Sequence, residues 1–148
     1  TQGVSSAASD VYKRQKQEAQ NVELEQICIK GINHTYAISN VKKEFRKAVD
    51  ESWDGIPPWK RYQKKLIEDL AVLELEKEKA IDLPQFEKLA GNDRLYCIRH
   101  PESKKNVRVI YVIEEGAIIL LTAFLEKNRG DYKRAVDTAL ERLKWLAR

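Results

Sequence analysis

The chain contains no methionine, only two cysteines and no apolar run long enough to cross a bilayer. Without methionine, no start codon is represented in the 148 residues. Cys28 and Cys97 lie far apart and lack the spacing of a metal site, so we expect small buried thiols in a reduced, cytoplasmic setting. Nothing at the start resembles a signal peptide, and there is no internal repeat. These absences argue against a membrane protein, a disulfide-stapled secreted domain and a zinc-binding domain, and we expect no metal and no cofactor.

What is present is the composition of one globular domain. Charged residues make up 34% of the chain and hydrophobic residues 43%, and this length can bury a real core. The net charge of +4 is unevenly placed. Residues 1–98 hold 16 basic and 16 acidic side chains, which leaves 11 basic and 7 acidic side chains for residues 99–148. A modest basic excess of this kind favours nucleic acid or another polyanion as a partner.

The first fifteen residues do not read as part of a domain. The stretch SSAASDVYKRQ, from Ser5 to Gln15, matches the in-frame translation of a transposase-type sequencing-library adapter. We therefore expect residues 1–15 to be a disordered scar on a fragment assembled from bulk DNA, with the true N-terminus unknown. We expect residues 16–34 to be a partly ordered extension and residues 35–148 to be the folded domain.

Hydrophobic spacing predicts an α+β fold. Residues 16–26 are polar and could be helical, and residues 27–39 predict one strand or a hairpin. A first helix is expected after an N-cap at Ser39 or Asn40, and a second is expected to begin at Pro58. Three strands and a last helix follow, at Leu95–His100, Val107–Ile113, Ala117–Phe124 and Asp131–Arg148.

Loop lengths predict how the three late strands pair. A three-residue loop, Glu114 to Gly116, suits a type I turn with a bulge and sets Tyr111 against Ile119. A symmetric six-residue loop between the first two strands sets Arg99 opposite Arg108. One face of the sheet is then apolar and needs helices against it; it comprises Tyr96, Ile98, Val107, Val109, Tyr111, Ile113, Ile119 and Leu121.

The other face carries Arg99 and Arg108 side by side, with Lys127 and Arg129 just beyond the third strand. Like charges opposite each other on a sheet are unfavourable by about 0.2–1 kcal/mol, and this register supplies no carboxylate opposite Arg108. Converging cations without an acidic partner predict a phosphate site. His100 falls on the core face, which favours a structural role, and capping the last helix is the favoured role for Asp131.

From about Thr35 to its end the chain resembles the RelE/ParE superfamily of bacterial type II toxins, in particular its HigB-like, phage-related host-killing branch. The likeness is strong from Lys88 onward and rests on the order of elements before that. The resemblance rests on Leu95-Tyr96…Ile98-Arg99, Arg108-Val109-Ile110-Tyr111, Leu120-Leu121…Phe124…Lys127 and Ala135…Arg142-Leu143. It implies the element order β-α-α-β-β-β-α, in which two N-terminal helices pack on one face of an antiparallel-rich sheet and a helix ends the chain. It also implies metal-independent cleavage of mRNA on the ribosome, held off by a bound antitoxin of the helix-turn-helix type. Thr122 stands where the family has histidine, and Glu126 where it has a basic residue.

RNA cleavage by its own 2′-hydroxyl needs a base, stabilisation of the phosphorane charge and protonation of the 5′-oxygen. Arg108 suits the charge role, Arg99, Lys127 and Arg129 could share it, and Tyr132 could stack on a base or transfer a proton. A second set of cations could either contact RNA or form a merely solvated surface. It comprises Lys88, Lys104, Lys105, Lys133 and Arg134. Two other functions stay open: a ParE-like toxin that inhibits DNA gyrase by protein contact, and an inactive member that only binds.

Overall fold

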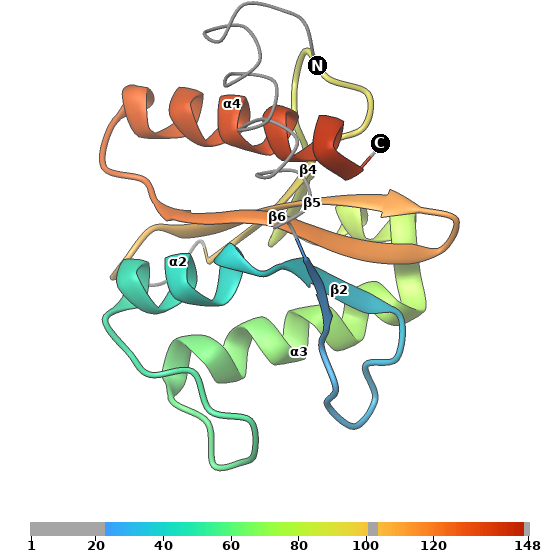
Figure 1. Ribbon diagram of the computed structural model, residues 1–148, viewed down its shortest axis with the longest axis vertical. Helices are drawn as coiled ribbons and strands as arrows, with labels where there is room; N and C mark the ends of the chain where they lie inside the picture. The colour runs from blue at the N-terminus through green and yellow to red at the C-terminus, as the bar shows by residue number, and fades with distance from the viewer. Residues whose placement is uncertain (1–22, 101–103, 147–148) are drawn as a thin grey trace, which may run out of the picture.

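The computed structural model describes residues 23–100 and 104–146, and the prediction for residues 1–15 lies outside them. The described chain forms one six-stranded sheet with helices on both sides (Figure 1). Its strands are β1 Leu24–Gln26, β2 Thr35–Ile38, β3 Phe86–Lys88, β4 Tyr96–Arg99, β5 Val107–Glu114 and β6 Ala117–Leu125. Its helices are α2 Asn40–Val49, α3 Arg61–Glu76, the short 3₁₀ helix η1 Lys77–Asp82 and α4 Arg129–Leu146.

The strands run in the order β1-β2-β6-β5-β4-β3, and every neighbouring pair is antiparallel except β2 and β6, which are parallel. The expected α+β class, antiparallel-rich sheet and C-terminal helix are confirmed. Two short strands were not predicted: β3 adds an edge beside β4, and β1 forms within residues 16–26, where a helix was expected. Both extend the sheet at its outer edges and leave its centre unchanged.

The helices before β3 lie on the side of the sheet opposite α4 (Figure 1). α2 runs beside β6, whereas α3 reaches the sheet through buried side chains such as Leu66 and Leu70. The expected helix start at Pro58 is wrong, because Lys60 is still extended and α3 begins at Arg61. The buried amide of Gln63 explains the longer loop, because it hydrogen-bonds both the backbone N–H and the carbonyl of Asp54, at 2.8 and 2.6 Å.

The pairing of β4 with β5 is as predicted, with Arg99 opposite Arg108, but the pairing of β5 with β6 is not. Glu115 and Gly116 both have positive φ, 51° and 83°, so the turn is a two-residue hairpin and Glu114 pairs with Ala117. The register then shifts again: Tyr111 pairs with Leu120, but Ile110 pairs with Thr122. Leu121 is therefore one extra residue in β6, a bulge.

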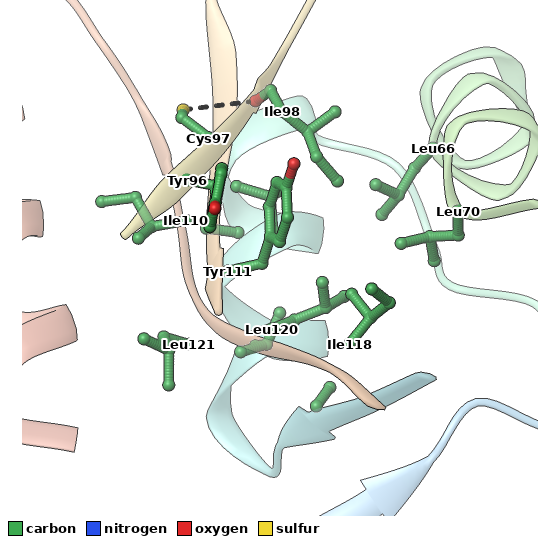
Figure 2. Close-up of a cluster of buried hydrophobic side chains, with 14 of the residues drawn as sticks. Leu66, Leu70, Tyr96, Cys97, Ile98, Ile110, Tyr111, Ile118, Leu120 and Leu121 are labelled. Atoms are coloured by element: carbon green, nitrogen blue, oxygen red, sulfur yellow. Dashed lines mark hydrogen bonds between the residues drawn. The ribbon is translucent and has the colours of Figure 1, made fainter. Parts of the chain in front are cut away.

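Because side chains alternate along a strand, these shifts decide which face each β6 residue occupies. Figure 2 shows Tyr111, Ile118 and Leu120 on the side of Leu66 and Leu70, with Ile110 and Leu121 on the other side. The expectation that Ile119 and Leu121 share the face of Tyr111 is therefore wrong. Both faces are buried at the centre of the sheet, since Ile110, Val112 and Leu121 are covered as fully as Val109 and Tyr111.

The second half of β6 extends past β2 and has a free edge, which an ion pair between a buried arginine and a half-buried glutamate covers. Arg142 of α4 donates to the carbonyl of Leu121 at 2.7 Å, and Glu44 of α2 accepts from the N–H of Ala123 at 3.4 Å and the hydroxyl of Thr122 at 3.1 Å. Two further hydrogen bonds join Arg142 to Glu44, at 2.8 and 2.9 Å. Side chains thus occupy the backbone groups that another strand would otherwise pair with.

Two smaller points concern the cysteines and the helices. Cys97 is buried as expected, but Cys28 is exposed, because it follows β1 in the loop that leads to β2. Within residues 23–100 and 104–146, no helix has the length and apolar character needed to cross a membrane.

The edge pair predicts a large loss of stability on Arg142→Leu. The substitution leaves the buried Leu121 carbonyl and the half-buried Glu44 carboxylate without this partner, and leaving such groups unsatisfied costs about 1–3 kcal/mol. Urea unfolding should show this loss, whereas Glu141→Gln, on an exposed position of the same helix, should change the free energy of unfolding by less than about 0.5 kcal/mol. Equal stability of Arg142→Leu and wild type would contradict the role given to the pair.

Candidate functional site

Arg108 lies near the start of β5, on the face that α4 covers, and its side chain is 16% exposed. One guanidinium nitrogen donates to Glu87 Oε1 at 2.7 Å. Arg108 Nε lies 3.0 Å from Glu126 Oε2, but the N–H is not aligned with that oxygen and no hydrogen bond forms. Arg108 is therefore held between two carboxylates, which corrects the expectation that it has no acidic partner.

Arg99 completes the cluster from the neighbouring strand. Its Nη1 lies 3.7 Å from Glu87 Oε2, and its Nε donates to the carbonyl of Pro84 at 2.8 Å. The carboxylate of Glu87 thus contacts both arginines and offsets the repulsion that their direct pairing would cause. We call Arg99, Arg108, Glu87 and Glu126 the arginine–glutamate cluster; its formal charges sum to zero.

Tyr132, in the first turns of α4, closes one side of this cluster. Its ring centroid lies 5.9 Å from the guanidinium carbon of Arg108 and 6.5 Å from the ring of Phe124. Burial, helped by the nearby negative groups, raises the pKa of Tyr132 above its ordinary value of 10.0. A raised pKa weakens the case for Tyr132 as a base, and its position suits packing against the arginine.

Lys127 and Arg129 are exposed beyond the end of β6, in the segment that leads into α4. Asp131 holds this segment by accepting from the backbone N–H groups of Lys127 and Asn128, at 2.9 and 3.1 Å, while Asn128 Oδ1 accepts from the Asp131 N–H at 3.1 Å. This reciprocal pattern is a capping box with Asn128 as the N-cap. Asp131 therefore caps the helix as expected, but as its third residue, because α4 begins at Arg129 and not at Asp131. Among the described residues, the ion pairs of the cluster's glutamates are with Arg99 and Arg108, and neither Lys127 nor Arg129 takes part in them.

A groove runs along the free edge of β6 between α2 and α4. One hollow of about 390 Å³ lies between Glu44, Lys47, Phe124, Lys127 and Asp131. A second of about 230 Å³ continues it toward Thr122, Arg134 and Thr138. Lys127 lines this groove, so the structure divides the expected site: Arg99, Arg108 and Tyr132 gather at the cluster, and Lys127 belongs to the adjoining groove.

The second set of cations does not form one surface. Lys88 is on the face of Tyr96, its partner across the strands, and therefore opposite Arg108. Lys105 donates through Nζ to the carbonyl of Val49 and lies 5.9 Å from the ring centroid of Tyr62, so it caps the C-terminal end of α2.

Lys104, Lys133 and Arg134 are exposed, and Arg134 pairs with Asp131 at 2.6 Å. His100 is 4% exposed and its Nδ1 lies 3.3 Å from the carbonyl of Val107, a position that suits the structural role expected for it. Burial lowers the pKa of His100 below its ordinary value of 6.5. No group of three or more possible metal ligands occurs in the described part of the chain.

Sequence reasoning missed the two glutamates. Glu87 lies on β3, a three-residue strand too short to show a period, so nothing in the local pattern placed it beside the arginines. Glu126 was noticed only as a departure from a basic residue. The predicted pairing of Tyr111 with Ile119 sets Thr122 opposite Arg108, whereas Phe124 is the true partner, which brings Glu126 two residues closer to Arg108. Glu87 could have been found only by extending the predicted strand pairing to β3, because Glu87 pairs with Cys97, on the same face as Arg99.

A family model described as "Phage derived protein Gp49-like (DUF891)" matches residues 51–144, from the loop before α3 to the last turn of α4. That family is one of the RelE-like toxin group. No curated protein and no solved structure matches significantly.

The capping box predicts a pH-dependent effect of Asp131→Asn. The hydrogen bond from the Lys127 backbone N–H, with the others described, lowers the pKa of Asp131 below 3.8, so the carboxylate stabilises the fold at pH values above 3.8 and this contribution is lost as pH falls through the lowered value. Urea unfolding at pH 7 and pH 2.5 should show wild type more stable than Asp131→Asn at the higher pH and the difference shrinking at the lower. A difference that stays constant with pH would count against this role of the ionised carboxylate.

Proposed function

This chain belongs to the phage-derived Gp49-like family of the RelE-like toxin group, and we propose that it is the toxin of a type II toxin–antitoxin system that cleaves mRNA on the ribosome. The family match supports the toxin class, because it covers α3 and every strand that builds the cluster. The observation that carries the chemistry is the convergence of Arg99 and Arg108 on the carboxylate of Glu87. We place the chain in the HigB-like branch on its strand motifs.

The arginines supply the charge stabilisation that this reaction needs. When the 2′-oxygen attacks phosphorus, the phosphorane gains negative charge on its non-bridging oxygens. Arg108 stays protonated at all relevant pH values and can direct two N–H groups at a phosphate, and Arg99 lies opposite it in the sheet. Both come from paired central strands, so their positions are fixed by the backbone ladder rather than by a loop.

Glu87 is our candidate for the base. Glutamate side chains are generally ionised at neutral pH, whereas lysine and tyrosine, with ordinary pKa values of roughly 10, are not deprotonated there. In the proposed step the 2′-hydroxyl gives its proton to Glu87, the O2′–P bond forms and the P–O5′ bond breaks. The 5′-oxygen takes a proton from Lys127 or from water, which leaves a 2′,3′-cyclic phosphate and a 5′-hydroxyl.

Two observations favour a second function, that of a member which binds a partner and cuts nothing. The charges of the cluster cancel, and Thr122 hydrogen-bonds Glu44 where the related toxins have a histidine. A gyrase-binding toxin belongs to this second class, since it needs contact but no phosphate chemistry. A nuclease leaves cut mRNA, whereas a toxin that acts by protein contact leaves mRNA intact, so mapping of RNA ends separates the two functions.

The partner that keeps such a toxin silent is, in this proposal, a cognate antitoxin with a helix-turn-helix DNA-binding part. The exposed cations beyond β6, Lys127, Arg129 and Lys133, offer it a basic rim beside the groove. An acidic antitoxin segment over this rim would block access to the cluster by charge and by volume.

Expression of the chain from Lys16 onward should arrest bacterial growth, and a cognate antitoxin encoded beside it should relieve the arrest. Mapping of RNA ends should show cuts within translated frames that disappear when initiation is blocked. Arrest with intact mRNA and accumulating DNA breaks would favour the gyrase alternative, and normal growth with folded protein would count heavily against any toxin.

Arg108→Ala and Glu87→Gln should each lower the cleavage rate about 10²–10³-fold, because each removes a group that acts in the transition state. Arg108→Lys keeps the charge but loses the fork of N–H groups, so it should restore activity only in part. Cleavage of a reporter mRNA in a reconstituted translation system is the measurement.

Two controls calibrate this series. Arg94→Ala removes an exposed arginine that pairs with Glu114 at the other end of the sheet, and it should leave the rate unchanged. Val109→Asp puts a charge on a fully buried position and should abolish activity by unfolding. Full activity of Arg108→Ala, or unfolding of Arg108→Ala to the same extent as Val109→Asp, would show that the site is misassigned.

A further inference from the structure

The side chain of Glu126 lies beside Arg108, a position that the path of the backbone does not by itself require. Its backbone is fixed, because its N–H donates to the carbonyl of Asn106 at 2.9 Å just beyond the end of β6. Its side chain turns back over the sheet face, 22% exposed, and places Oε2 3.0 Å from Arg108 Nε. The contact between this carboxylate and Arg108 therefore needs a physical reason of its own.

The contact is a poor structural ion pair. Neither Arg108 Nε nor Glu126 Oε2 has a hydrogen-bond partner in the described part of the chain, although both atoms are buried. Burying two charges without hydrogen bonds gains little, because the desolvation cost offsets the attraction. Glu87, by contrast, makes an aligned hydrogen bond to Arg108 at 2.7 Å. Arg108 is therefore positioned by Glu87 and only neutralised by Glu126.

Arginine grips a phosphate with two N–H groups on one edge of its planar fork. One nitrogen is engaged by Glu87, and the Nε–H faces the poorly aligned carboxylate of Glu126. A phosphodiester carries the same unit charge as a carboxylate and presents two similar oxygens. It could take the place of the Glu126 carboxylate at Arg108 and make the hydrogen bond that Glu126 does not make.

We propose that Glu126 acts as an internal counter-ion that occupies the phosphodiester position on Arg108, and that single-stranded RNA displaces it on binding. This rests on the proposed function for the identity of the ligand but does not require that the RNA be cut. With Glu126 in place the cluster has no net charge; with Glu126 displaced or neutralised it carries one positive charge. The exposed Lys127 and Arg129 follow directly and would guide the strand to it.

The consequence is that Glu126 weakens RNA binding. Glu126→Gln keeps the shape of the side chain and removes its charge. Removing one negative charge in contact with the phosphate position should tighten binding about tenfold at low salt, the size of a charge–charge interaction in a partly exposed site. The dependence of affinity on salt should also steepen. In the wild type the displaced Glu126 carboxylate takes up a cation, which offsets one counterion released by the RNA, and Glu126→Gln removes this uptake.

The test is the dissociation constant of a fluorescent 2′-O-methyl RNA 12-mer, which cannot be cut by its own 2′-hydroxyl. The matched control is Glu68→Gln, which changes the net charge equally but lies exposed on α3, on the other side of the sheet. Relative to the wild type, we expect about tenfold tighter binding for Glu126→Gln and less than a twofold change for Glu68→Gln. The double variant Arg108→Gln/Glu126→Gln should bind no more tightly than Arg108→Gln alone.

Glu126→Ala serves as a second variant should Glu126→Gln fail to fold, since it removes the same charge from a partly exposed position. Binding by the folded Glu126 variant that is no tighter than that of Glu68→Gln overturns the proposal, and so does a gain that persists without Arg108. The probe reports binding and cannot be cleaved. If the wild-type protein cleaves no mRNA, the nuclease function is refuted, while the effect of Glu126 on RNA binding is still decided by these dissociation constants.

Discussion

The ion pair between Glu44 and Arg142 determines more of this molecule than its two residues suggest. It joins α2 to α4 across the free edge of β6 and occupies the backbone groups that the bulge at Leu121 turns outward. The bulge in turn moves Phe124 and Glu126 to the face of Arg108, because one extra residue reverses the alternation of a strand. The ion pair thus holds the backbone at the bulge that sets which β6 side chains surround the central arginine.

The cluster illustrates how a sheet can hold like charges together. Arg99 and Arg108 are direct partners on β4 and β5, which alone would repel. The outer strand β3 supplies Glu87, which contacts both, and Glu126 adds a second carboxylate from beyond β6. A neutral cluster is stable without a ligand, and the same arrangement presents two arginines to a phosphate once a carboxylate is displaced.

The sequence contained enough to predict the centre of the fold. Strong apolar strands and a fixed loop length placed Ile98, Arg99 and Arg108 correctly, because the pairing of β4 with β5 is regular. The pairing with β6 was wrong, since neither a two-residue turn nor a bulge is visible in hydrophobic alternation. Glu87 could not be found from its neighbours, because β3 is too short to carry a pattern and its place is set by tertiary pairing.

The central claim is that the arginine–glutamate cluster guides an attack by the RNA's own 2′-hydroxyl. The chemistry of the new RNA ends tests it most directly, because this attack leaves a 5′-hydroxyl and a 2′,3′-cyclic phosphate. Fragments produced by the purified protein on translating ribosomes should be ligated at their 5′ ends only after treatment with a polynucleotide kinase. Fragments with 5′-phosphates, or RNA that stays intact, would contradict the account.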